Sequence, residues 1–217
     1  MLLRAFDGEG NAYPIEEFIL AAEQTDVISI IDLQVIIHTM QELPAYVELG
    51  IVQAGVNISP ISCKYREFRK SVESLLEEHR SLCPYLVFEI TEMSEGIEHA
   101  SLQAWLEKLR SYGVQIAIDD FGKGNAGLAR ALNMPFGLLK LDKSIAWECE
   151  KNHFARALIG KIIEAVTSEG KEVVAEGIET EQQAKIMSQM GSRYLQGYLW
   201  TAPMPEKAYR QWIIAHA

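Results

Sequence analysis

The chain has 217 residues, of which 48% are apolar and 23% are charged, a composition typical of a globular protein with one domain-sized core. The net charge of −10 argues against binding to nucleic-acid polymers, which requires basic surfaces. Three cysteines without a CxxC pair and five scattered histidines predict thiols in a reducing compartment and no zinc site. We find no signal peptide and no apolar run of bilayer length, so the sequence predicts a cytoplasmic protein without membrane contact.

Predicted helices alternate with predicted strands along the chain. Helical patterns begin near residues 14–24 and 29–43, and apolar stripes at i, i+3 and i+4 spacing separate the later strands. This alternation indicates a parallel sheet of the α/β class. A closed barrel of this kind needs eight strands in about 250 residues. We therefore predict a TIM-like (β/α) barrel, incomplete at its N-terminus, as a single domain over residues 1–217. Apolar runs predict six strands near residues 51–57, 85–90, 114–119, 137–141, 172–176 and 194–198, and residues 1–4 resemble the tail of one more.

Charged and amide side chains stand at the ends of these apolar runs. A buried strand cannot keep a carboxylate that is neither paired nor bound to a metal. In a barrel of parallel strands the carboxyl ends meet on one face, which is where active sites are built. We therefore predict a site from the polar residues at the strand ends, which are Asn57, Glu89, Glu92, Asp119, Asp120, Lys140, Asp142, Glu176, Glu179 and Gln196.

The donor atoms of this group are almost all oxygens. An all-oxygen ligand set selects Mg²⁺, Mn²⁺ or Ca²⁺ over zinc or copper. Asp119 and Asp120 are adjacent at a strand end, where the chain turns, so they can contact two metal ions about 3.5–4 Å apart. Two such ions polarise a phosphoryl oxygen and activate a water molecule. Lys140 would lie near that water, and a lysine acts as a base only where metals and desolvation lower its pKa. Taken singly, each carboxylate is better explained as a solvated loop residue or a helix cap.

Several segments together resemble one known family. They are "VNISP", "FEITE", "IAIDDFGKG", "LLKLDKS", "VVAEGIET" and "QGYLWTAPMP", which occur in that order over nearly the whole chain. The chain resembles the EAL domain family, whose members hydrolyse the second messenger cyclic di-GMP. The double aspartate alone would be a weak signal, whereas the ordered set is highly specific.

The resemblance implies a role for each matched residue. Asn57, Glu89 and Asp119 would bind the first metal, Asp120 would bind the second, and Glu176 would hold a metal or its water. Lys140 would assist the attacking water, so Lys140 and Glu176 are the implied catalytic residues. The remaining matches imply ligand contacts by Arg4 and Gln196, a loop-stabilising role for Glu92, and Mg²⁺ or Mn²⁺ as cofactor in a two-metal site.

The match departs from the family pattern in two places. The family's signature glutamate would lie one residue before Met1, together with the strand that carries it. Three explanations are open: a start assigned to an internal methionine, a chain cut at this point, and a genuinely shortened, silent member. The loop after the double aspartate differs as well, with Lys123, Asn125 and Ala126-Gly127 where the family favours Thr, Tyr and Ser-Ser. That loop couples metal binding to dimerisation in the family.

Two functions from different classes follow from the resemblance. The first is a phosphodiesterase that hydrolyses cyclic di-GMP to linear pGpG, slowly or not at all in the chain as written. The second is a catalytically silent receptor for cyclic di-GMP or a protein-interaction domain. The retained lysine, double aspartate and late glutamate favour the enzyme. The implied partners are cyclic di-GMP, a second copy in a homodimer, and fused or partner sensor or cyclase-like domains.

Overall fold

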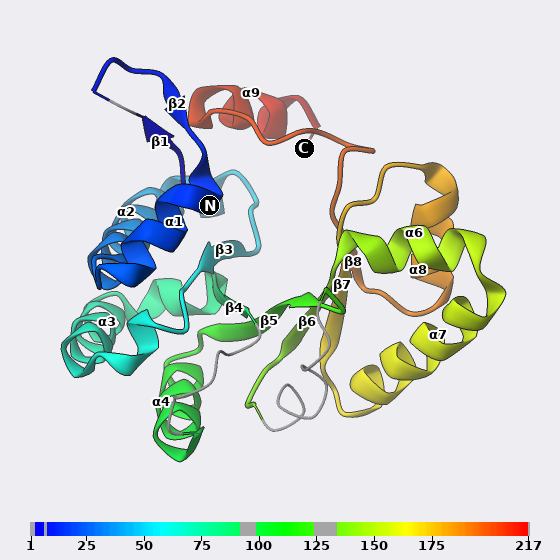
Figure 1. The fold of residues 1–217 in the computed structure, drawn as a ribbon, viewed down its shortest axis with the longest axis horizontal. Helices are drawn as coiled ribbons and strands as arrows, with labels where there is room; N and C mark the ends of the chain where they lie inside the picture. Colours follow the sequence, from blue (N-terminus) through cyan, green and yellow to red (C-terminus); the bar gives the residue numbers. More distant parts are fainter. Residues whose placement is uncertain (1–2, 7, 92–98, 124–133, 217) are drawn as a thin grey trace. The chain divides into compact units, whose positions relative to one another are not determined.

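The structure is a computed structural model that describes residues 3–6, 8–91, 99–123 and 134–216 (Figure 1). This part of the chain divides into two compact units. The six parallel strands follow the sheet order β3-β4-β5-β6-β7-β8, which confirms the predicted parallel architecture. In chain order the elements are β1 (Ala5–Phe6), β2 (Ala12–Tyr13), α1 (Ile15–Gln24), α2 (Ile28–Glu48), β3 (Ala54–Asn57), η1 (Ser62–Lys64), α3 (Arg66–Glu78), η2 (Arg80–Tyr85), β4 (Leu86–Thr91), α4 (His99–Ser111), β5 (Gln115–Phe121), β6 (Leu138–Leu141), α6 (Lys143–Lys151), α7 (His153–Ser168), β7 (Glu172–Ala175), α8 (Glu181–Gln189), β8 (Tyr194–Leu195) and α9 (Glu206–His216).

The first unit contains the elements from β1 to β4 together with α4 and α9. It begins with a short antiparallel hairpin, in which Ala5 pairs with Tyr13 and Phe6 with Ala12. The prediction that residues 1–4 form the tail of a strand is wrong for Leu3 and Arg4, which have no strand structure, while Met1 and Leu2 lie outside the described residues. The strand begins later because its pairing partner, β2, reaches only Ala5 and Phe6.

Helix α2 runs five residues beyond its predicted end and contains Pro44. A proline inside a helix removes one backbone hydrogen bond and usually ends the helix. Here the last two turns are held by α9, because Arg210 bonds Glu42 at 2.7 Å and Tyr209 packs on Tyr46 at 5.8 Å between ring centroids. Contacts from a distant segment therefore override the local signal.

A buried carboxylate joins α2 to the loop that follows β3. Asp32 lies on the apolar stripe of α2 and is only 6% exposed. Its Oδ2 accepts hydrogen bonds from the Ser59 backbone N–H at 2.8 Å and from the Ser62 hydroxyl at 2.6 Å. Burial raises the pKa of Asp32 from 3.8 to about 6, against these two hydrogen bonds and with a smaller contribution from Glu23. Because this loop directly follows Asn57, Asp32 fixes the chain at that strand end.

The raised pKa of Asp32 predicts a pH-dependent stability. The folded state binds a proton more tightly than the unfolded state, so stability is greatest at low pH and is lost as pH rises through the window from about 4 to 6. Between pH 4.5 and 7.5 this group alone should remove about 2 kcal/mol from the free energy of unfolding. Asp32→Asn can accept the same hydrogen bonds without titrating. Urea unfolding should therefore show a smaller difference in the free energy of unfolding between pH 4.5 and 7.5 for the variant than for the wild type. An equal difference in the two proteins would contradict the prediction.

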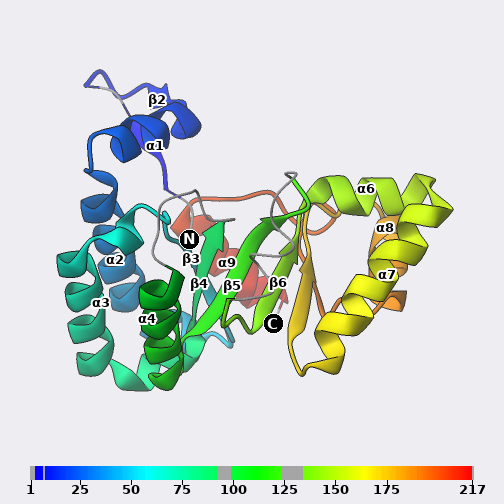
Figure 2. The same cartoon turned by 60° about the horizontal axis from the view of Figure 1, so that its bottom comes forward.

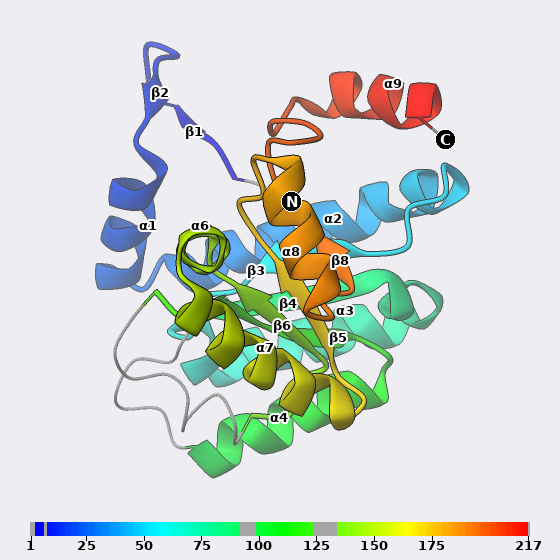
Figure 3. The same ribbon diagram turned by 90° about the vertical axis from the view of Figure 1, so that its right-hand side faces the viewer.

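The second unit contains β5 to β8 with α6, α7 and α8. Strand β6 pairs in parallel register with β5 and with β7, and β7 pairs with β8, with β5 and β6 visible as neighbours in Figure 2. The strands are apolar on both faces, as a parallel sheet covered by helices requires. Helix α6 packs against both α7 and α8, as Figure 3 shows. The buried apolar residues of these strands include Ile116, Ala117, Ile118, Leu138, Leu139, Leu141, Val173, Val174 and Ala175.

Among the residues that the structure describes, no helix is both long enough and apolar enough to cross a membrane. The single domain over residues 1–217 stays a prediction.

Candidate metal centre

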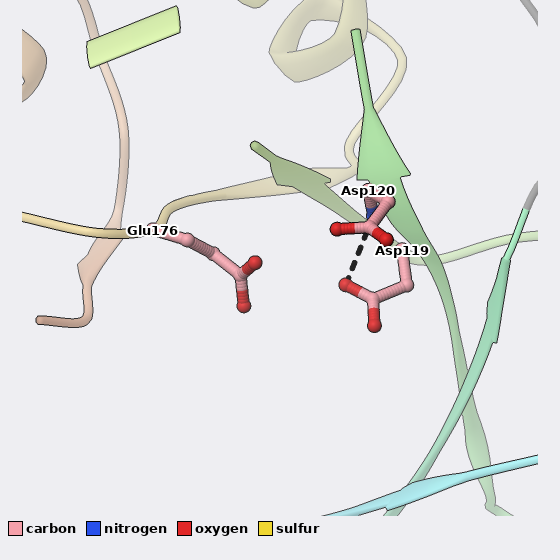
Figure 4. A group of neighbouring side chains, drawn as sticks. All are labelled: Asp119, Asp120 and Glu176. Carbon is pink, nitrogen blue, oxygen red and sulfur yellow. Dashed lines mark hydrogen bonds between the residues drawn. The ribbon is translucent and has the colours of Figure 1, made fainter. Parts of the chain in front are cut away.

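Three carboxylates from two strands of the second unit converge on one point. Asp119 and Asp120 belong to β5, and Glu176 follows the last residue of β7 (Figure 4). One oxygen from each side chain lies within 4.8 Å of an oxygen from both others. Figure 4 shows the Glu176 side chain extending toward the two aspartates. The group therefore offers three oxygen ligands to a single cation.

A break in the strand geometry brings Asp119 and Asp120 together. In a regular strand, successive side chains point to opposite faces. Asp120 instead has a φ of +55°, and the pairing register between β5 and β6 shifts between Ile118 and Phe121. The Asp120 backbone N–H donates a hydrogen bond of 3.0 Å to Asp119 Oδ1, which holds this left-handed conformation. Such an irregularity re-aims a side chain at the end of a strand.

Lys140 lies inside the same group. Its ammonium is 2.8 Å from Asp119 Oδ1 and 2.8 Å from Glu176 Oε1. Only 6% of the Lys140 side chain is exposed, compared with 12% for Asp119 and 19% for Glu176. A buried charge is tolerated only when it is paired and hydrogen-bonded. Lys140 therefore compensates the charge of two of the three carboxylates.

The chain turn after Glu176 depends on a glycine. Gly177 has a φ of +61°, and a Cβ at this position would lie 2.1 Å from Lys143 Cβ and 3.0 Å from Lys143 Cα. No other residue fits against the first turn of α6 in this conformation. The Glu176 backbone N–H also bonds Leu141 O at 3.1 Å, which extends the pairing of β7 with β6. The turn at Gly177 and the hydrogen bond to Leu141 together fix the backbone of Glu176.

The donor chemistry of the group fits a hard divalent cation. All three ligand atoms are carboxylate oxygens, and two of the three residues are only partly buried, so a cation can enter with some of its water. Mg²⁺, Mn²⁺ and Ca²⁺ prefer such ligands, whereas zinc and copper sites use nitrogen and sulfur. Asp119, Asp120 and Glu176 are the residues that could hold the metal.

Other residues at the strand ends serve the fold. Asp142 caps α6, accepting from the Ser144 backbone N–H at 2.9 Å and from the Ser144 hydroxyl. Burial acts to raise the pKa of Asp142, but the hydrogen bonds from Ser144 and the nearby Lys123 and Lys143 charges outweigh it, so this pKa is lowered. Glu179 precedes the Thr180 cap of α8 and donates its backbone N–H to Gln183. The Asp142 carboxylate is therefore a helix cap, whereas Glu179 contributes its backbone to the cap of α8.

The remaining predicted site residues are spread over both units. Asn57 and Glu89 occupy paired register positions on β3 and β4 of the first unit. Arg4 is exposed and donates to Leu3 O at 2.9 Å. Gln196 follows β8, is exposed, and pairs its backbone with Ala175 and Ile178. Glu92 lies outside the described residues. Their roles as ligands, substrate contacts or loop support stay predictions.

The sequence interpretation missed one charged residue at this centre. Lys123 places its ammonium 3.1 Å from Asp120 Oδ2. The available signal was the opposite charge three residues after Asp120 with a glycine between, which predicts a tight turn. From the sequence, Lys123 is only a departure of the loop from the family pattern.

Known proteins resemble this chain in sequence and in fold. Cyclic di-GMP phosphodiesterase PdeF of Escherichia coli is 32% identical over 212 residues, which cover 94% of this chain and 28% of PdeF. The EAL enzyme Bd1971 in its cAMP- and cyclic-di-GMP-bound form superposes with a TM-score of 0.86 at 27% identity, covering 98% of this chain and 59% of that one. The PaMucR phosphodiesterase in complex with c-di-GMP gives a TM-score of 0.83 at 28% identity, covering 96% and 85% of the two chains.

These likenesses confirm the predicted barrel type and the predicted family. The chain spans only about a quarter of the length of PdeF. The family model for the EAL domain matches residues 1–203, from the first hairpin through the strand end at Gln196. The chain belongs to the EAL domain family.

Proposed function

We propose that this chain is a metal-dependent phosphodiesterase that hydrolyses cyclic di-GMP to linear pGpG. The observation that carries the proposal is the buried Lys140 ammonium, held 2.8 Å from both Asp119 and Glu176 beside a third carboxylate. A buried ion pair adds little net stability compared with an apolar core, so stability alone does not explain its presence. It supports a reaction centre, in which charges are arranged around a reacting group. PdeF and PaMucR are named as phosphodiesterases, which supports the same reaction.

The proposed metal is Mg²⁺ or Mn²⁺ in a two-metal site. Asp119 would be a ligand of the first ion with Asn57 and Glu89, Asp120 of the second, and Glu176 of an ion or its water. When bound, such ions polarise the phosphoryl oxygens and make a water molecule easier to deprotonate. The support from this chain is the all-oxygen character of Asp119, Asp120 and Glu176 and their mutual spacing within 4.8 Å.

The proposed role of Lys140 is to orient the attacking water and to move its proton. Hydrolysis adds the water oxygen to phosphorus and breaks the bond from phosphorus to the 3′ oxygen, which leaves with a proton. Lys140 can hold a proton next to this path, because its ammonium already bonds two carboxylates that flank the site. Its burial keeps bulk water from competing for those hydrogen bonds.

Substrate and partner contacts complete the proposal. Arg4 would pair with a phosphate of cyclic di-GMP and Gln196 would contact the ligand or the metal-bound water network. We also propose that the protein forms a homodimer in the cytoplasm and works with sensor or cyclase-like domains, either fused or as partners. Glu92 would stabilise the loop that follows Asp120.

The test is product analysis with the full chain. Cyclic di-GMP is incubated with Mn²⁺, with Mg²⁺ or with EDTA, and pGpG is measured by chromatography, while calorimetry follows nucleotide binding in parallel. We expect pGpG to form slowly with either metal and not at all with EDTA. Calorimetric binding without any pGpG would overturn the enzyme and favour the silent receptor. No binding by the folded protein would overturn both.

A further inference from the structure

The turn after β5 brings a lysine back over the end of its own strand. The Lys123 backbone N–H donates a hydrogen bond of 3.1 Å to Asp120 O, which closes a tight turn over Asp120, Phe121, Gly122 and Lys123. Gly122 has a φ of +102°, and a Cβ on it would lie 2.5 Å from Ile145 Cδ1. A positive φ at the third residue is what a type II turn requires. The turn thus fixes the position of the Lys123 Cα relative to Asp120.

This turn produces an ion pair with the candidate metal ligand. Lys123 Nζ lies 3.1 Å from Asp120 Oδ2, one of the two oxygens with which this carboxylate could hold a cation. The Lys123 side chain is 66% exposed and that of Asp120 is 34% exposed. The charge of Lys123 also acts on Asp142, where it contributes to lowering the pKa of that carboxylate. Lys123 therefore adds positive electrostatic potential on the exposed side of the cluster, next to Asp120.

The two lysines of the cluster differ in how readily they can be displaced. Lys140 is buried and bonds two carboxylates, so moving it would break two buried ion pairs. Lys123 has an exposed, flexible stem and its ammonium can return to water at small cost, since exposed ion pairs are weak. Of these two lysines, Lys123 is therefore the one that a cation binding to Asp120 would displace.

We propose that Lys123 is a built-in competitor for Asp120, so that this chain binds a divalent cation more weakly than it would with a neutral residue at position 123. The inference rests on the proposed function only in taking Asp120 as a metal ligand. It assigns Lys123 the role of setting the metal concentration at which the site fills. Because the stem of Lys123 is exposed, added salt should screen the competition and reduce its effect.

The experiment measures Mn²⁺ affinity directly, without nucleotide. Calorimetry on the EDTA-treated full chain compares the wild type with Lys123→Met, which keeps the stem and removes the charge. Lys123→Arg keeps the charge. Lys161→Met is the matched control, because Lys161 forms an exposed i,i+3 pair with Glu164 on α7. We expect Lys123→Met to bind Mn²⁺ about three- to fivefold more tightly. Lys123→Arg and Lys161→Met should stay within about twofold of the wild type.

The outcomes separate this inference from the proposed function. An affinity gain for Lys123→Met that is no larger than that for Lys161→Met overturns the competition. An equal gain for Lys123→Arg overturns it too, because the charge would then be irrelevant. The competition is also overturned if neither the wild type nor the variants bind Mn²⁺. If Lys123→Met gains affinity while cyclic di-GMP is never hydrolysed, the competitor stands and the phosphodiesterase falls. If hydrolysis occurs and the affinities are equal, only the competitor falls.

Discussion

Replacing Lys140 by methionine is expected to lower cyclic di-GMP hydrolysis by about two to four orders of magnitude, the range of a positioned acid–base group. The change removes the only charge that bonds both Asp119 and Glu176 among the described residues. pGpG formation at fixed, saturating Mn²⁺ is the measurement. Lys161→Met serves again as the control, because it removes a lysine from an exposed pair on α7. A Lys140→Met protein with full activity would show that Lys140 does not act in the reaction.

Stability has to be followed in the same variant. Removing one partner from a buried ion pair costs about 3–5 kcal/mol, and the lower end applies here because Asp119 and Glu176 keep some solvent contact. Lys140→Arg is the variant that keeps the charge and much of the stability. Its guanidinium does not give up a proton near neutral pH, so hydrolysis should still fall strongly. If Lys140→Arg recovers both the stability and the rate, Lys140 acts only as a structural counter-ion and not in proton transfer.

Asp119→Asn is expected to weaken Mn²⁺ binding about 10- to 100-fold and to reduce hydrolysis at least as much. The variant keeps the size of the side chain but removes one anionic oxygen from the three-carboxylate group. It also leaves Lys140 with Glu176 as its remaining partner in the cluster. Calorimetry with Mn²⁺ measures the affinity, and chromatography measures pGpG.

The matched control for Asp119 lies on a strand of the same sheet. Glu172 begins β7, at the opposite end of that strand from Glu176, and pairs with Arg193 at 2.7 Å. Glu172→Gln removes the same charge outside the cluster and should change Mn²⁺ affinity by less than about twofold. Equal effects of the two substitutions would mean that metal binding follows the net charge of −10 rather than the cluster.

Much of the architecture could be predicted from local patterns. Each of the six expected strands is present, because buried parallel strands need uninterrupted apolar runs, and such runs are visible without a structure. Helix α2 shows the limit of this reasoning. Pro44 predicts a helix end, and the helix continues because Arg210 and Tyr209, more than 160 positions later, contact its last two turns. No local pattern contains that contact.

The candidate site divides in the same way. The sequence by itself determined which residues are available: carboxylates and a lysine at the ends of apolar runs, in the order of the EAL domain family. Only the tertiary structure decided how they combine. The left-handed conformation of Asp120, the double ion pair of Lys140 and the approach of Lys123 to Asp120 each depend on the backbone or on partners from another strand. The physical reason is that a charge at a strand end acquires its role from the charges beside it, and folding places those neighbours.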